Sequence, residues 1–376
     1  MNILQINCNY ILSALHRNMI AHLDNDEIKT TVFMPLWQQN LKDTYKANDH
    51  EIVRVCFHKW DRLLFFRKQR KILKALKESC GDISGFDCIH ALTLFTDGNA
   101  AYTLSKQYKI PYFVAIRDTD VNTFFKIKPY LRPRGVKIMR GASAVFFLSE
   151  TYKNDVLGRF VPKRYRAEIE AKSHVVPNGI DDFWLQNKYL ERDPSVIEEK
   201  LRSRSLSVVC VGRINKRKNI PTVQKAMEIL RSRGWNTQLD VIGKVEDPAE
   251  LEIIRSDRFT TYYPPTDMKG LIDFYRRADI FVLASHYETF GLVYAEAMSQ
   301  GLPVIYTRGQ GFDGQFPDGE VGYAVNDRDP ADIADKIEEA LANYSAITEK
   351  AVSCVDRFDW SVICRLYRSM YFALSH

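Results

Sequence analysis

The sequence predicts an α/β protein made of two doubly wound domains that face a cleft, each a parallel sheet with helices on both faces. Short apolar runs alternate along the chain with segments of helical periodicity, which is typical of parallel sheets. The chain has 376 residues, enough for two domains with separate cores. The turn-containing segment VVPNGIDDFW, residues 175–184, separates two such alternating series.

The expected strands are apolar runs bounded by polar or turn residues. In the first series they lie at residues 2–8, 29–35, 51–57, 86–92, 111–116 and 143–149. In the second series they lie at residues 206–212, 239–243, 279–285, 302–307 and 321–325. Between the first two of these, NIPTVQKAMEILRSRG predicts a helix with Pro221 in its first turn and Gly234 after its end.

These series place a first domain at residues 1–178 and a second at residues 179–359. The last segment, residues 360–376, continues the aromatic-rich helical pattern DWSVICRLYRSMYFAL. A helix with so many large apolar side chains needs a sizeable partner surface. We expect it to return to the first domain and complete it.

Composition indicates a soluble globular protein, because 45% of the residues are hydrophobic and 27% are charged. No apolar run approaches the ~18 residues that cross a bilayer. The opening MNILQINCNY lacks the basic start of a signal peptide. The seven cysteines form no CxxC pair, which favours reduced thiols in a cytoplasmic protein.

The net charge of +6 is unevenly distributed. Eight basic residues and one acid lie between residues 57 and 77, and six basic residues without an acid lie between residues 121 and 141. Aromatic side chains are interleaved with both groups: Trp60, Phe65, Phe66, Phe124, Phe125 and Tyr130. Such segments are either solvated helix faces or surfaces that attract anionic lipid head groups or another polyanion. The second interpretation predicts peripheral contact with the inner face of the cell membrane.

A first candidate site follows the strand that ends at Val211. Open parallel sheets bind ligands at the carboxyl ends of their strands. In VGRINKRKN, Gly212 permits close approach of the backbone, and Arg213 and Lys218 stand around the turn that opens the next helix. Two cations beside a helix N-terminus suit a diphosphate. The alternative is that this basic loop is ordinary solvated surface.

A second candidate site follows the strand at residues 279–285, in YETFGLVYAEAM. The turn would present backbone N–H groups to an anionic oxygen from Thr289, Phe290, Gly291 and Leu292. Glu288 is itself negative, so we expect it to accept hydrogen bonds from sugar hydroxyls. Glu296 could accept them from a second pair of hydroxyls, as on a ribose. The alternative for Glu296 is an ordinary acidic residue near the start of a helix.

The pattern E-x-F-G-x-x-x-x-E-A-M-x-x-G-x-P-V-I, after a strand, resembles the signature of the retaining glycosyltransferase family four. VGRINKRKN is similar to the basic diphosphate loop of that family, and VVPNGID to its interdomain segment. The motifs span residues 175–326, and the order of strands extends the resemblance over nearly the whole chain. The resemblance implies the GT-B fold, with two Rossmann-like domains, and transfer that retains anomeric configuration.

The family resemblance also implies roles by position. Arg213 and Lys218 would bind the diphosphate and neutralise the leaving group, with Gly212 beside them. Glu288 would contact the donor sugar, residues 290–292 would supply backbone donors, and Glu296 would hold the ribose. The second domain would bind a nucleotide-sugar donor and the first an acceptor.

The first domain departs from the family pattern. After IPYFVA, where many relatives place a His, this chain has Arg117. Arginine cannot act as a general base near pH 7 because its pKa exceeds ~12. It could still stabilise phosphate charge or hold the donor sugar, so it joins Glu288, Arg213 and Lys218 as a catalytic candidate. Asp118 and Asp120 are acceptor-side candidates, or else members of a strand-end Asx turn.

Three short sequence features match patterns of other functional sites, but their context does not support those functions. DTD, residues 118–120, matches a short metal-binding D-x-D, but the cations at 213 and 218 make a metal unnecessary. GQGFDG, residues 309–314, does not open a helix as a dinucleotide fingerprint must, and by resemblance faces the donor. His90 is expected to pack at a strand edge.

The sequence therefore predicts a glycosyltransferase that moves a hexosyl-type sugar from a nucleoside-diphosphate sugar, UDP favoured over GDP. The acceptor would be a glycan or a lipid-linked molecule in surface polysaccharide or glycoconjugate synthesis. No cofactor and no metal are expected. The alternatives are a nucleotide-sugar-binding protein without catalysis and a GT-B protein directed to nucleic acid, although nucleic acid is not the expected partner.

Overall fold

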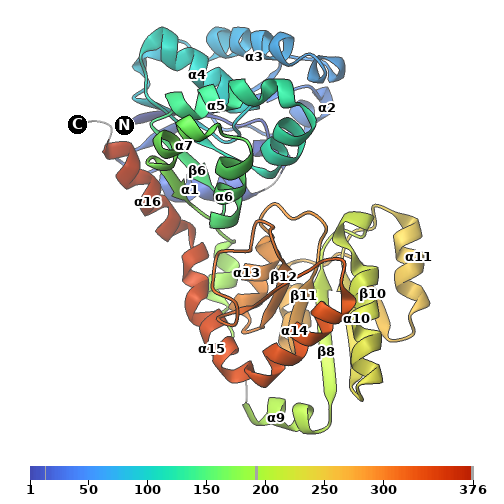
Figure 1. The fold of residues 1–376 in the computed structure, drawn as a ribbon. Coiled ribbons are helices and arrows are strands. Elements are labelled where there is room, and N and C mark those ends of the chain that lie inside the picture. Colours follow the sequence, from blue (N-terminus) through green and yellow to red (C-terminus); the bar gives the residue numbers. More distant parts are fainter. Residues whose placement is uncertain (13, 191–193, 374–376) are drawn as a thin grey trace. The chain divides into compact units, whose positions relative to one another are not determined.

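A computed structural model describes residues 1–12, 14–190 and 194–373 of the chain (Figure 1). The chain divides into two units. Unit 1 consists of Met1–Asn178 together with Trp360–His376, and unit 2 consists of Gly179–Asp359.

Unit 1 is built on a seven-stranded parallel sheet with the order β3-β2-β1-β4-β5-β6-β7. Its strands are β1 (Asn2–Ile6), β2 (Lys29–Leu36), β3 (Glu51–Val55), β4 (Cys88–Ala91), β5 (Tyr112–Ala115), β6 (Ala144–Phe147) and β7 (Ser173–Val175). Its helices are α1 (Leu15–Leu23), α2 (Gln39–Thr44), α3 (Phe65–Ser79), α4 (Thr96–Tyr108), α5 (Arg132–Gly141), α6 (Glu150–Arg159), α7 (Lys163–Glu170) and α16 (Trp360–Phe372). Short 3₁₀ or π turns are η1 (Tyr10–Leu12), η2 (Lys59–Arg62), η3 (Ile83–Gly85), η4 (Asp120–Phe125) and η5 (Pro129–Leu131).

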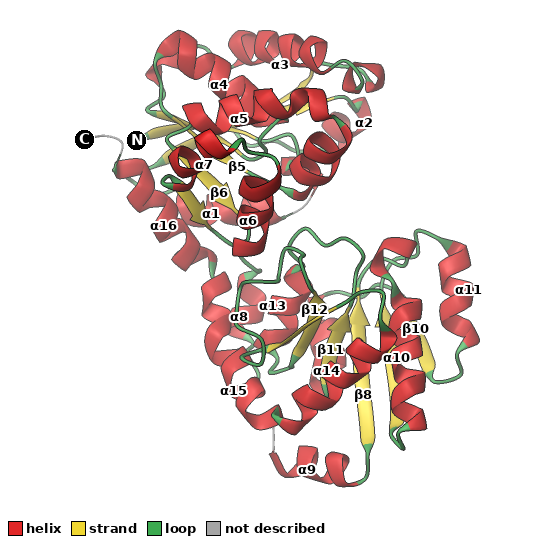
Figure 2. Cartoon of the chain, in the orientation of Figure 1, coloured by secondary structure: helices red, strands yellow, loops and turns green. Residues whose placement is uncertain are grey.

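Unit 2 is built on a six-stranded parallel sheet with the order β10-β9-β8-β11-β12-β13, and helices flank its strands (Figure 2). Its strands are β8 (Ser205–Val211), β9 (Asn236–Ile242), β10 (Thr260–Tyr263), β11 (Ile280–Leu283), β12 (Val304–Thr307) and β13 (Gly322–Val325). Its helices are α8 (Asp182–Gln186), α9 (Pro194–Arg202), α10 (Ile220–Ser232), α11 (Pro248–Ser256), α12 (Met268–Arg277), α13 (Leu292–Ser299), α14 (Pro330–Ala342) and α15 (Tyr344–Cys354), with the 3₁₀ turns η6 (Lys216–Lys218) and η7 (Val355–Phe358).

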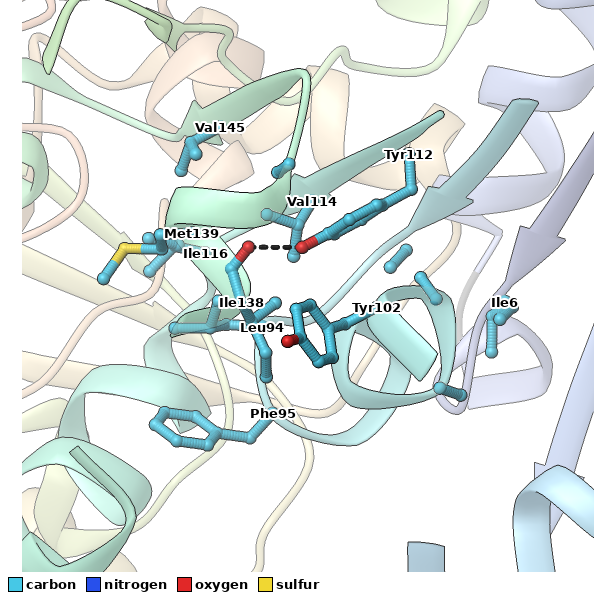
Figure 3. Packing of buried hydrophobic residues seen from close by; sticks show 14 of the residues in the cluster. Ile6, Leu94, Phe95, Tyr102, Tyr112, Val114, Ile116, Ile138, Met139 and Val145 are labelled. Atoms are coloured by element: carbon cyan, nitrogen blue, oxygen red, sulfur yellow. Dashed lines mark hydrogen bonds between the residues drawn. The ribbon is translucent and has the colours of Figure 1, made fainter. Parts of the chain in front are cut away.

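The sheet of unit 1 is buried on both faces, as expected for parallel strands rich in apolar residues. On one face, α4 and α5 pack on β4–β6, and the Tyr112 hydroxyl donates a 2.5 Å hydrogen bond to the carbonyl of Ile138 (Figure 3). On the other face lie α1 and α16. The Tyr371 hydroxyl of α16 lies 2.6 Å from His90 Nδ1 in β4, so His90 is a buried packing residue.

The structure confirms the predicted fold class and the eleven expected strands, and it adds two. β7 and β10 are short strands at sheet edges, with half-buried side chains in sequences, SHV and TTYY, that lack an apolar run. Within the described ranges, no helix combines the length and the apolar character needed to cross a membrane.

Candidate functional site

The candidate donor-binding residues of unit 2 lie where the direction of strand addition changes. β8 is paired with β9 on one side and with β11 on the other, so the loops that follow β8 and β11 diverge to opposite faces of the sheet. Ligands of open parallel sheets bind at such a switch point, outside the carboxyl ends of the strands. The loop after β8 carries Lys218, and the loop after β11 carries Glu288.

Lys218 and Glu288 meet at this point. The Nζ of Lys218 lies 2.5 Å from Oε2 of Glu288, and each side chain is only 9% exposed. The Ser285 hydroxyl donates to the same carboxylate oxygen at 3.4 Å, and the backbone N–H of Thr289 donates to Oε1 at 3.2 Å. The carboxylate is therefore fixed in place by groups from both loops.

The turn before Lys218 is itself closely held. Asn215 accepts a hydrogen bond from the backbone N–H of Lys218, and Asn219 adopts a left-handed conformation, with φ +56°, at the start of α10. The Asn219 side chain donates to the carbonyls of Ala284 and Asp327, at 2.9 and 2.6 Å. Asn219 thus ties the turn after β8 to the end of β11.

A third loop, after β12, reaches the same place. The Gln310 side chain accepts a hydrogen bond from the backbone N–H of Glu288, and the N–H of Gly311 donates to the Glu288 carbonyl. A Cβ on Gly311 would lie 1.8 Å from the carbonyl oxygen of Thr289, so only glycine permits this approach. The GQGFDG segment is not helical, as expected, and it packs against the loop that holds Glu288.

Gly212 and Arg213 differ in their surroundings. A Cβ on Gly212 would lie 3.1 Å from Cε of Lys218, so the missing side chain leaves room for the lysine. The Arg213 side chain is 68% exposed and pairs with Glu246 at 2.8 Å. Arg213 therefore lies in the same loop as Lys218 but is not part of the buried pair.

The start of α13 follows Glu288 directly. Gly291 precedes the helix with φ +79°, and a Cβ there would lie 2.3 Å from the Tyr294 ring, so two independent features require glycine. Leu292 is the first helical residue. The Phe290 ring is buried against Phe312 and Phe358, so only backbone atoms of Phe290 could contact a ligand.

Glu296 lies one turn into α13 and is half-buried. Burial, together with the Asp181 carboxylate, raises the pKa of Glu296 to about 7, although the Tyr275 hydroxyl donates to it at 3.4 Å and opposes this shift. A carboxyl group with such a pKa can change its charge near neutral pH. Hydroxyl groups that donate to Glu296 would favour the ionised form.

In unit 1, the Arg117 guanidinium is held by the carbonyl of Leu92 at 3.2 Å and by the Asn178 side chain at 2.7 Å. Asp118 accepts from Asn122 and, at 3.5 Å, from the Tyr152 hydroxyl. The structure thus gives all three of Arg117, Asp118 and Asp120 partners within unit 1.

Asp120 is buried, and its carboxylate accepts three backbone hydrogen bonds of 2.9–3.0 Å, from Leu94, Phe95 and Arg117. Burial raises the pKa of Asp120 to about 6 despite these bonds. Asp120 thus holds the turn after β5 through N–H groups that precede it in the chain, which is not the Asx turn considered for it. The described residues contain no cluster of His, Cys, Asp or Glu suited to a metal ion, and the DTD segment forms none.

Sequence reasoning missed Arg217 and His286. Arg217 Nη1 lies 3.9 Å from Glu288 Oε1 and donates to the carbonyl of Tyr287 at 2.7 Å. His286 Nδ1 lies 2.5 Å from an Asp327 carboxylate oxygen. The sequence could have indicated Arg217, because a tight turn at KRK brings neighbouring side chains to one face of the loop. The sequence contains no pattern that indicates His286.

Two family descriptions match the chain. Glycosyltransferase Family 4 matches residues 16–182, and Glycosyl transferases group 1 matches residues 192–356. Among curated proteins, the chain is similar to the capsular polysaccharide biosynthesis glycosyltransferase CapM of Staphylococcus aureus. The two are 32% identical over 211 residues, which are 54% of this chain and 53% of CapM. The alignment thus spans about half the length of that relative.

Solved structures show the same fold at low sequence identity. Sucrose-phosphate synthase from Thermosynechococcus elongatus superposes with a TM-score of 0.75 and 20% identity, covering 99% of this chain and all of that one. Anabaena HepE in complex with UDP-glucose superposes with a TM-score of 0.65 and 16% identity, covering 100% of this chain and 99% of HepE.

Proposed function

Since the chain belongs to the family 4 and group 1 glycosyltransferases and has their GT-B fold, we propose that it transfers a hexosyl-type sugar from a nucleoside-diphosphate sugar with retention of anomeric configuration. The observation that supports this most is the buried contact of Lys218 with Glu288 at the switch point of unit 2. In this contact a cation lies next to a carboxylate, and we assign the carboxylate to the hydroxyls of the donor sugar.

Charge favours a diphosphate at this point. Arg213, Arg217 and Lys218 lie in one loop, and α10 and α13 both begin beside it. Helix N-termini and fixed cations together attract phosphate oxygens. Glu288 is repelled by a phosphate and is suited to accept hydrogen bonds from the hydroxyls of the sugar.

The proposed reaction requires little of the protein beyond positioning and charge. The bond between the anomeric carbon and the diphosphate oxygen breaks, and the acceptor hydroxyl forms its new bond on the same face. The leaving phosphate oxygen takes the acceptor proton. Lys218 stabilises the negative charge that develops on the leaving group, as a preorganised donor does for an oxyanion. Arg117 of unit 1 is a further candidate for this role.

The finer parts of the proposal rest on similarity. HepE holds UDP-glucose in its crystal structure, which supports UDP over GDP as the nucleotide here. CapM is a capsular polysaccharide enzyme, which supports a glycan or lipid-linked acceptor in surface polysaccharide synthesis. No cofactor is proposed beyond the donor substrate.

Nucleotide release from a panel of UDP-, GDP- and ADP-sugars tests the proposal. We expect one UDP-sugar to be consumed, slowly with water and faster with an acceptor glycan. Thermal stabilisation by nucleotides without consumption of any donor would favour a binding protein without catalysis. The proposal would be contradicted if no nucleotide stabilised the chain and no donor sugar were consumed.

A further inference from the structure

Two segments of unit 1 expose large apolar side chains that soluble proteins normally bury. They are residues 59–66 and 126–130, and we call them, with the exposed face of α3, the docking patch. Their exposed apolar side chains are Trp60 (78% exposed), Leu63 (66%), Leu64 (55%), Phe66 (54%), Ile127 (71%) and Tyr130 (63%). Elsewhere in the described chain, only Leu190 is as exposed, and the other large apolar side chains are at most 52% exposed. Clustered exposed apolar side chains mark an interaction surface.

The two segments lie side by side. The Phe65 ring, at the start of α3, contacts Phe66 at 5.2 Å and Phe124 at 6.0 Å between ring centroids. Lys128 lies over the Phe124 ring at 5.3 Å. Phe66 of the first segment and Phe124, which directly precedes the second, thus lie around the same Phe65 ring, so the two segments adjoin in unit 1.

Basic side chains surround the apolar ones. α3, which lies at the outer edge of unit 1 in Figure 1, buries Phe65, Gln69, Ile72 and Leu76. Its opposite face exposes basic side chains at helical spacing: Arg67, Arg70, Lys74 and Lys77. Lys59 and Lys126 are also exposed. The buried acid of this region, Asp61, is neutralised by Lys71 at 2.6 Å and Arg67 at 3.1 Å.

We propose that the docking patch binds unit 1 to the surface of an anionic lipid bilayer. Basic side chains attract anionic head groups, and aromatic and aliphatic side chains enter the boundary between head groups and acyl chains. Nucleic acid would use the cations and could stack on the aromatics, but it offers nothing to Leu63, Leu64 and Ile127. A second copy of the chain would bring the same cations together, and their repulsion opposes self-association.

A cavity beside the docking patch could receive the acceptor of a chain that is bound to a membrane. It has a volume of about 290 Å³, and its lining includes Lys68 of α3, Lys128 and the turns after β1 and β2. A lipid-linked acceptor in the bilayer would present its polar head group next to this cavity. This last step depends on the proposed function, whereas the docking itself does not.

Flotation of the full chain with vesicles tests the docking. We expect binding to phosphatidylcholine vesicles that contain about one third phosphatidylglycerol, weak binding to phosphatidylcholine alone, and loss of binding at high salt. The triple variant Trp60→Ser, Leu64→Ser, Phe66→Ser should bind at least ~10-fold more weakly. Arg70→Gln with Lys74→Gln should weaken binding roughly 25-fold, about fivefold for each charge near the membrane.

Matched changes in unit 2 serve as controls. Ile253→Ser and Lys225→Gln remove an exposed apolar and an exposed basic side chain and should leave vesicle binding unchanged. All variants should keep the circular dichroism and unfolding midpoint of the parent. Equal binding to neutral and anionic vesicles, or binding that the patch variants do not weaken, overturns the proposal. The proposal is also overturned if the basic residues of the patch alone bind a DNA duplex. It is overturned as well if the chain forms a dimer that the triple variant dissociates. Donor hydrolysis, measured without lipid, reports separately on the proposed function.

Discussion

Lys218 and Glu288 are expected to contribute both to the stability of unit 2 and to the transfer reaction. As a pair with 9% exposure each, they satisfy one another, and removal of either leaves a buried charge without its partner. The same two groups are the ones proposed to contact the diphosphate and the sugar. Their effects on stability and on activity can therefore be separated by changing one and then both.

Lys218→Met is expected to lower the free energy of unfolding of unit 2 by roughly 3–5 kcal/mol, because the buried Glu288 carboxyl group loses its closest cation. Addition of Glu288→Gln should recover most of this loss, since it removes the carboxyl group that has lost its closest cation. Urea unfolding monitored by fluorescence measures both. Equal stability of the single variant and the parent would show that the pair is not structurally important.

Transfer activity should not recover in the double variant. Loss of the cation at the leaving group is expected to lower kcat/KM by roughly 100- to 1,000-fold in both variants, as for removal of an oxyanion donor. Lys225→Met, at an exposed position of α10, is the control and should leave kcat/KM unchanged. If the double variant regained activity along with stability, Lys218 would have only a structural role.

Glu296 predicts a pH effect. Its pKa in the folded chain is raised to about 7, so folding favours the protonated form. The contribution of Glu296 to the free energy of unfolding of unit 2 should be most favourable below the ordinary glutamate pKa of ~4.3 and fall as the pH rises to about 7. Glu296→Gln should remove this fall and raise the unfolding temperature at pH 8, while changing it little at pH 4.

Nucleotide binding should show the opposite trend, because ribose hydroxyls donate best to the ionised carboxylate. Calorimetric titration with UDP should give tighter binding by the parent at pH 8 than at pH 6, and weaker binding with a smaller pH dependence by Glu296→Gln, because the terminal phosphate of UDP still titrates in this range. Equal affinities of parent and variant at both pH values would remove Glu296 from the ribose site.

The sequence named candidate residues but not the partners that they have in the folded chain. The sequence placed Lys218 and Glu288 after two different strands and expected separate ligand contacts for them, and it did not indicate that the two side chains pair with each other. It could not indicate that Arg213 pairs with Glu246, which follows a different strand. It also could not show that Asp120 turns inward to three backbone N–H groups, because one Asp in a strand-end turn has many possible partners.

At the scale of elements, apolar runs predicted eleven strands and missed β7 and β10. Both missed strands lie at sheet edges, where one side needs no neighbouring strand and side chains stay half-buried. Ser, His, Thr and Tyr are tolerated there, so periodicity and hydrophobicity carry little information. Central strands must be apolar on both faces, which is why all of them were found.

The contact between the loops after β11 and β12 predicts a second effect. Gly311→Ala places a methyl group 1.8 Å from the Thr289 carbonyl oxygen, so one loop must move. We expect at least a ~10-fold weaker Kd for UDP, because the loop that moves holds Glu288. Gly309→Ala, in the same loop but with open space around its Cβ, should change Kd less than twofold and cost about 1 kcal/mol of stability, because its φ is +78°.

The turn between β5 and η4 depends on Asp120. Asp120→Ala leaves three buried backbone N–H groups without acceptors and should destabilise unit 1 by roughly 2–5 kcal/mol. Asp120→Asn keeps one acceptor oxygen and should lose less. Thermal unfolding at pH 7.5 compares them. An Asn variant with normal stability and no transfer activity would instead indicate direct contact with the acceptor.

At the scale of the whole molecule, the candidate donor residues other than Arg117 belong to unit 2. UDP at 100 times its Kd should add ~2.7 kcal/mol to the unfolding free energy of the unit that binds it. Hydrogen exchange with and without UDP should show protection concentrated in residues 212–219 and 284–297. Protection confined to unit 1 would contradict the assignment of the donor site.

Unit 1 contains both the first residues of the chain and α16, which packs beside α1 over β4, β5 and β6. During translation, at least 359 residues must be synthesised before this helix is made, and all of unit 2 is among them. Unit 2 can thus fold on the nascent chain before α16 is available. Until then, one face of the sheet of unit 1, with Phe113 and Phe146, lacks the helix that buries it. This exposed apolar face is the part of the ribosome-bound polypeptide to which a chaperone would bind.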